Sequence, residues 1–97
     1  MLGFEIRHVG INTIDEVAAG GVADAFSAMF GMEQKDGNAS IFVGKAFEVM
    51  KSPYLGTYGH IAVQTNSVDR AFYHLSKQGY QFNMDTAAYD ADGRLKI

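Results

Sequence analysis

The chain has 97 residues, of which 47% are hydrophobic, so it suits one small domain with a real core. It contains no cysteine, which excludes disulfides and thiolate metal sites and fits a reducing, cytoplasmic location. A net charge of −3 argues against nucleic-acid binding, and the apolar runs are far shorter than the roughly 20 residues of a membrane span. We therefore expect a soluble cytoplasmic α+β domain.

The first half of the chain predicts a strand followed by a helix. Apolar and other residues alternate from Phe4 to Thr13, which is typical of a strand. Thr13 and Glu16 form a capping-box pattern at the start of the helix, and Gly31 is placed to end it. Two glycines, Gly20-Gly21, predict a late start or a kink, with the main body from about Val22. The expected core of this helix is an apolar stripe of Val22, Phe26, Met29 and Phe30.

Three short strands follow in the prediction, separated by turns. They cover Glu33 to Lys35, Ser40 to Val43, and Ala46 to Lys51. A linker rich in turn formers and tyrosines, residues 52–59, then leads to the second half of the chain.

The second half predicts another strand and another helix. The strand runs from His60 to Thr65, and either Asn66 or Ser67 caps the helix. The apolar stripe of this helix consists of Val68, Ala71, Phe72 and Leu75. Gly79 ends the helix, Tyr80 to Met84 reads as a strand, residues 90–93 as a turn, and Arg94 to Ile97 as the start of another strand.

One short motif occurs twice in the chain. Residues 8–12, HVGIN, return 52 positions later as residues 60–64, HIAVQ. Each copy is a predicted strand that a helix follows, which indicates two related modules, 1–53 and 54–97, sharing one site within one domain. The second module lacks a final strand, so either the sequence is a piece of a longer protein or a second chain pairs with the open edge. We expect a homodimer formed through that edge.

Three residues are candidate metal ligands because of their phase in the predicted strands. His8, Glu48 and His60 alternate out of phase with the apolar residues beside them, and so face away from the two helices. If the sheet curls, two imidazoles and one carboxylate converge, the ligand set of non-haem Fe(II) and of many Zn, Mn or Ni sites. The alternative is that each histidine is a hydrogen-bonded structural residue.

Further residues are candidate contacts for a small-molecule ligand. Asn12 and Gln64 share the histidine face, and Tyr58 lies in the linker as part of an aromatic rim. Their alternatives are hydrogen bonding at strand ends and packing across the linker. His74 lies away from the apolar stripe of the second helix, and we interpret it as a surface residue.

This layout resembles the vicinal oxygen chelate superfamily, which includes glyoxalase I, extradiol dioxygenases and the fosfomycin and bleomycin resistance proteins. The resemblance implies an α+β fold of tandem βαβββ modules in a curled mixed sheet. Metal-binding members take their ligands from the first and last strands of each module, and His8, Glu48 and His60 fall on three of those four places. The fourth would lie on the strand that the second module lacks. Some members, among them bleomycin-binding proteins, bind their ligand without a metal.

A narrower likeness concerns a glyoxalase-like domain at the C-terminus of some bacterial 2-keto-3-deoxy-phosphogluconate/4-hydroxy-2-oxoglutarate aldolases. The similar stretches are residues 7–12, 48–56, 59–62 and 89–96. The aldolase chemistry of that family needs a (β/α)₈ barrel of about 200 residues or more, which this chain does not contain. The resemblance implies a small-molecule-binding domain, with or without a divalent metal. Its alternatives are a metal-dependent lyase, isomerase or dioxygenase of the glyoxalase type, and a structural dimerisation domain.

Overall fold

A computed structural model describes residues 2–97 as an α+β structure with one five-stranded mixed sheet and two α-helices. In chain order the elements are β1 (Glu5–Ile11), α1 (Glu16–Phe30), β2 (Gln34–Asp36), β3 (Ser40–Val43), β4 (Phe47–Met50), β5 (Gly59–Gln64), α2 (Val68–Lys77) and the 3₁₀ helix η1 (Met84–Thr86). Among these residues, neither helix has the length and apolar character needed to cross a membrane.

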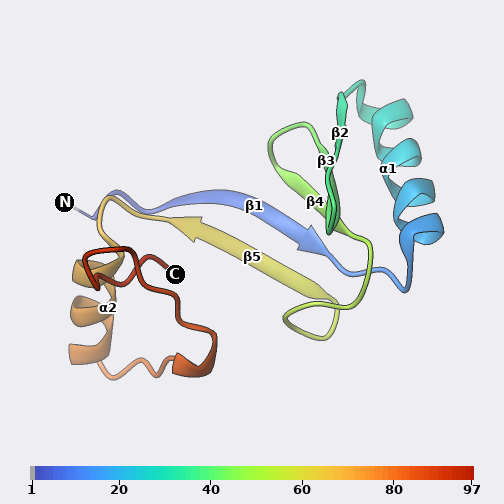
Figure 1. Ribbon diagram of the computed structural model, residues 1–97. Helices are drawn as coiled ribbons and strands as arrows, with labels where there is room; N and C mark the ends of the chain where they lie inside the picture. The colour runs from blue at the N-terminus through green and yellow to red at the C-terminus, as the bar shows by residue number, and fades with distance from the viewer. Residues whose placement is uncertain (1) are drawn as a thin grey trace. The chain divides into compact units, whose positions relative to one another are not determined.

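The sheet has the strand order β2-β3-β4-β1-β5 and is open (Figure 1). β1 and β4 pair in parallel, with Gly10 beside Glu48, while β2, β3 and β4 form an antiparallel meander. The chain must cross from β1 to the meander, and α1 makes this connection, as a parallel pair requires. β1 therefore lies between β4 and β5.

The chain divides into two compact units. One comprises Ile6–Val63, and the other comprises the residues up to Glu5 together with Gln64–Ile97. In the first unit α1 packs on one face of the sheet. The buried residues of this core are Ala19, Ala23, Ile41, Val43 and Val49, and Val22, Phe26, Met32 and Phe47 pack against them.

Helix α1 differs from its prediction at its start and in its packing face. Asp15, and not Thr13, is the N-cap, and its side chain accepts a hydrogen bond from the Ala18 amide. The Thr13 hydroxyl donates to the Met50 carbonyl at 2.6 Å, and the helix begins at Glu16, directly after Asp15. The helix runs without a break through both glycines, because its hydrogen bonds and the burial of Ala19 outweigh their low propensity.

The predicted stripe of α1 is right in its first half and wrong in its second. Val22 and Phe26 pack against the core, but Met29 and Phe30 are 63% and 56% exposed. The small residue Ala23 is fully buried instead, because it lets the helix approach the sheet closely. The Phe30 ring still packs against Phe26 and Phe47, with ring centroids 5.7 and 6.5 Å away, at the margin of this core. Gly31 ends the helix with φ of 67°, as predicted.

The last part of the chain also departs from its prediction. Residues 80–84 form no strand: the Tyr80 amide bonds back to Leu75, and the Asn83 side chain accepts from the Asp85 amide. Such local bonds compete with pairing between strands. The expected turn at 90–93 is present, and beyond it an isolated bridge joins Tyr89 to Leu95 and backbone hydrogen bonds join Ala88 to Lys96 and Ile97, in place of a strand. Among the described residues the second half thus contributes β5 and α2, so its membership of a second βαβββ module stays a prediction.

Two glycines of α1, one inside the helix and one at its C-terminal end, give stability predictions of opposite sign. A Cβ at Gly21, inside α1, would meet nothing within 4 Å, so Gly21→Ala should stabilise the fold by about 1 kcal/mol. Gly31→Ala places a Cβ on a left-handed residue and should destabilise it by about 1–2 kcal/mol. Chemical denaturation followed by circular dichroism measures both. A break in α1 at the glycines would reduce the gain at Gly21 to nothing.

Candidate metal centre

Three side chains from three neighbouring strands converge on the sheet face opposite α1. They are His8 on β1, Glu48 on β4 and His60 on β5. The central place of β1 explains the convergence, because residues on one face of a middle strand meet residues from both neighbours. The side chains are mostly buried, at 17%, 17% and 20% exposed in the same order.

The three ligand atoms form a small, nearly equilateral triangle. His8 Nε2 lies 3.1 Å from His60 Nε2 and 3.1 Å from Glu48 Oε1. The remaining side, from His60 Nε2 to Glu48 Oε1, measures 3.4 Å. Each residue thus offers one donor atom to one point.

The size of this triangle fits a bound transition metal. Metal–ligand bonds of about 2.0–2.1 Å place ligand atoms about 3.3 Å apart in a tetrahedron and about 2.9 Å apart in an octahedron. The three observed separations, 3.1 to 3.4 Å, lie between and around these values. The group could therefore hold a metal ion with little movement of its side chains, leaving further coordination positions for a ligand.

A hydrogen-bonded triad is the competing interpretation of the same contacts. One proton between the two imidazoles, or a protonated imidazole beside the carboxylate, would also draw the three groups together. A carboxylate only accepts hydrogen bonds, and a neutral imidazole carries a single N–H, so one shared proton joins only two of the three groups. A metal cation would instead accept a lone pair from each of the three groups at once. Metal content distinguishes the two interpretations.

The repeated motif has a geometric explanation in the pairing of β1 with β5. The two strands run in opposite directions (Figure 1). The backbone amide of Asn12 donates to the Tyr58 carbonyl at 2.9 Å. Continuing this antiparallel register places Gly10 opposite His60, and places Ala62 opposite His8. In each copy a small residue stands two positions after the histidine. Each strand thus supplies one imidazole and the room for the imidazole of the other.

The imidazole of His60 occupies the space that a side chain at Gly10 would need. A Cβ built there would lie 2.0 Å from His60 Cε1 and 2.3 Å from His60 Nδ1. The imidazole of His60 therefore rests on the bare backbone of β1. His60 Nδ1 is buried and has no hydrogen-bond partner within residues 2–97, so shape and not a hydrogen bond orients the ring.

Glu48 is oriented by a polar contact that the sequence analysis missed. The Ser40 hydroxyl on β3 donates to Glu48 Oε2 at 2.8 Å, while Oε1 faces the two histidines. Ser40 is 6% exposed, which makes it the buried polar residue of this face. The available signal was its phase, since Ser40 is two positions from Phe42 and both face the same side.

Aromatic rings pack against both imidazoles. Phe42 contacts His8 edge-to-face with ring centroids 5.8 Å apart, and Tyr54 contacts His60 in the same manner at 5.8 Å. Tyr54 belongs to the linker, whose position depends on Asn12. The side-chain amide of Asn12 donates to the backbone carbonyls of Tyr54 and Gly56, at 3.3 and 3.2 Å.

The predicted ligand contacts occupy different places. Asn12 contacts the linker through those two bonds, which is the hydrogen bonding given as its alternative role, and a ligand contact of Asn12 stays a prediction. Gln64 lies in the other unit, where its side chain donates to Glu5 at 2.9 Å. Tyr58 is 87% exposed and lines, with Thr57, His60 and Ile61, an open cavity of about 590 Å³. A ligand contact of Gln64 or Tyr58 stays a prediction as well.

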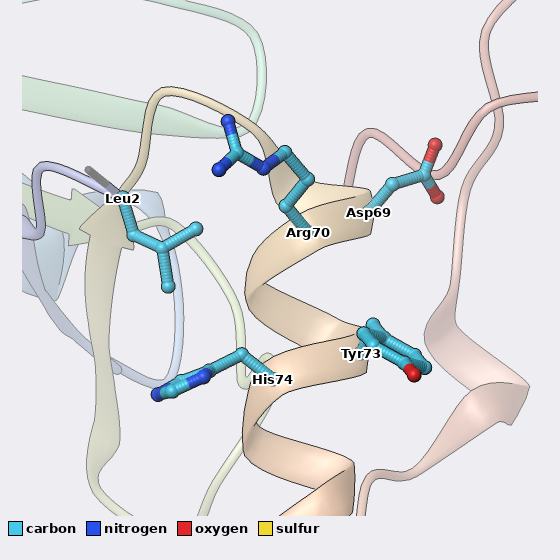
Figure 2. Close-up of a pocket in the computed structure, with 5 residues that line it drawn as sticks. All are labelled: Leu2, Asp69, Arg70, Tyr73 and His74. Carbon is cyan, nitrogen blue, oxygen red and sulfur yellow. The ribbon is translucent and has the colours of Figure 1, made fainter.

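A second cavity, of about 410 Å³, lies in the other unit (Figure 2). Its walls are Leu2 and four residues of α2, Asp69, Arg70, Tyr73 and His74. The carboxylate of Asp69 accepts from the Leu95 amide, and His74 contacts Gln78, so both have structural partners. His74 is exposed, in agreement with its interpretation as a surface residue. This cavity contains none of the three candidate ligands.

The chain was compared with family models, with curated proteins and with solved structures, and none of the three comparisons gives a match. The candidate centre therefore has to be argued from its own geometry.

The fit between Gly10 and His60 predicts a coupled pair of mutations. Gly10→Ala should destabilise the fold by about 1–3 kcal/mol, because its Cβ overlaps the imidazole. In a His60→Ala background the ring is absent, so the same substitution should have a much smaller effect. Denaturation of the four variants gives the coupling free energy. Equal effects in both backgrounds would show that the ring does not lie on Gly10.

Proposed function

We propose that this chain is a divalent-metal-binding domain that takes a small oxygenated ligand at the metal. The observation that carries the proposal is the triangle of His8 Nε2, Glu48 Oε1 and His60 Nε2, with sides of 3.1 to 3.4 Å. The two-histidine, one-carboxylate donor set suits Zn, Fe, Mn or Ni, with positions left open.

Burial supports binding over a chance cluster of polar groups. The three side chains are about four-fifths buried, and the two Nε2 atoms and Glu48 Oε1 lie 3.1 to 3.4 Å from one another. Removing such groups from water without a counter-ion is costly, whereas a cation at their centre compensates for all three. When bound, the metal would supply Lewis acidity toward an oxygen of the ligand.

The surroundings of the site favour an apolar or aromatic component in that ligand. The rings of Phe42 and Tyr54 flank the two imidazoles, and Tyr58 lies exposed beside His60.

We propose that such a domain serves a larger bacterial enzyme, a sugar-acid aldolase, as its ligand-binding part.

The first experiment is metal binding by the untagged chain. Equilibrium dialysis against Zn²⁺ or Co²⁺, followed by elemental analysis, should give about one metal per chain. Three variants each change one ligand side chain: His8→Ala, His60→Ala and Glu48→Gln. Each should weaken metal binding by more than about 100-fold, which exceeds the effect of changing a residue that contacts only a ligand side chain.

The matched control is His74→Ala, which removes an exposed imidazole on α2 and should leave metal affinity unchanged. Circular dichroism verifies that each variant folds. No bound metal in the unsubstituted chain, or equal loss in the His74 variant, would contradict the proposal and favour the hydrogen-bonded triad.

A second candidate function is self-association through β5. This strand forms one edge of the sheet, and Ile61 and Val63 on it are 65% and 56% exposed. An exposed edge with β-branched residues is a template for pairing with another strand. The occupant we propose is the same strand of a second copy, which gives a homodimer.

Sedimentation equilibrium tests this association. The unsubstituted chain should show a mass that rises from monomer to dimer with concentration, and Ile61→Lys should remain monomeric, since a charge on an edge strand opposes pairing. Ile14→Lys is the control, because Ile14 is 79% exposed in the segment before α1. Equal masses at all concentrations in the unsubstituted chain would contradict the dimer.

A further inference from the structure

The two oxygens of Glu48 have different partners. Oε1 lies 3.1 and 3.4 Å from the imidazole nitrogens of His8 and His60, whereas Oε2 accepts a 2.8 Å hydrogen bond from the Ser40 hydroxyl. One oxygen of the carboxylate therefore faces the candidate metal centre, and the other is hydrogen-bonded to strand β3.

Ser40 is itself held firmly. It pairs with Met50 across the ladder between β3 and β4, which places it diagonally from Glu48 on the same face of the sheet. Its carbonyl accepts from the Gly37 amide at 2.9 Å, so the hairpin turn fixes its backbone. With 6% of its surface exposed, the hydroxyl has little competition from water.

A hydroxyl bond to a carboxylate is charge-assisted and stronger than a neutral one. While it is made, rotation of the Glu48 carboxylate about its last bond is restricted, and Oε2 is kept away from the two imidazoles. Only Oε1 is then free to serve as a ligand atom.

We propose that Ser40 is a positioning residue that makes Glu48 a one-oxygen ligand and so sets both the affinity and the coordination number of the bound metal. This inference rests on the proposed function, because it concerns the same centre. It assigns a role to a residue that bonds to the metal ligand Glu48 without contacting the metal itself, and such outer partners change metal affinity by about 10- to 100-fold.

The test compares three serine variants of the full chain with Co²⁺ as the probe. Ser40→Ala should weaken Co²⁺ binding by about 10- to 100-fold. It should also change the intensity of the visible absorption of bound Co²⁺, because the freed Oε2 can join the coordination and Co²⁺ spectra depend on coordination number. Ser40→Thr keeps the hydroxyl, suits a strand, and should restore both affinity and spectrum.

Ser27→Ala is the matched control for a lost hydroxyl. Its Oγ donates to the Met32 carbonyl at 2.5 Å, on the helix side of the same unit. This variant should lower the denaturation midpoint while leaving the Co²⁺ affinity and spectrum unchanged. The comparison separates a specific effect on Glu48 from a general loss of stability.

The outcomes distinguish the two proposals. If the unsubstituted chain binds Co²⁺ and Ser40→Ala binds it with the same affinity and spectrum, the role of Ser40 is wrong and the metal centre stands. If the Ser27 variant loses affinity as the Ser40 variant does, the effect is one of stability, and the role of Ser40 is again wrong. If the unsubstituted chain binds no Co²⁺, the metal centre fails, and the role of Ser40 fails with it.

Discussion

The candidate site depends on the position of β1 between β4 and β5. A parallel pairing on one side places Gly10 beside Glu48, and an antiparallel pairing on the other side places Gly10 opposite His60. His8 shares a face with both of these side chains, so one strand gathers two histidines and a carboxylate from residues up to 52 positions apart. A different strand order with the same secondary structure would separate the three side chains.

The part of the site that the sequence could predict follows from periodicity alone. In a strand the side chains alternate between faces, so the out-of-phase residues His8, Glu48 and His60 had to lie opposite the apolar residues that pack under a helix. The repeat predicted that the two histidines share one site, but not that their strands are neighbours in the sheet. The strand bounds were close for the same reason, and the left-handed stop at Gly31 follows from the freedom of glycine at positive φ.

What the sequence could not predict depends on register and on competing local bonds. The phase of Ser40 puts it on the same face as Phe42, but only the ladder between β3 and β4 places it diagonally from Glu48. Asp15 and not Thr13 caps α1, while the Thr13 hydroxyl donates to the Met50 carbonyl, a contact between residues far apart in sequence. The strand expected at residues 80–84 gives way to bonds within the segment itself. Pattern rules carry no information about such partners.

The imidazoles and the carboxylate of the site are held in place by different kinds of interaction. Gly10 and the two aromatic rings hold the imidazoles by contact, without a hydrogen bond to His60 Nδ1 from residues 2–97, while Ser40 holds the carboxylate by a charge-assisted bond. The Nε2 atoms thereby face each other and Glu48. Three lone-pair donors held at 3.1 to 3.4 Å oppose one another electrostatically unless a proton or a metal lies among them. The contacts with Gly10, Phe42, Tyr54 and Ser40 keep the triangle small enough for either species, so the proton content and the metal content of the site are two sides of the same question.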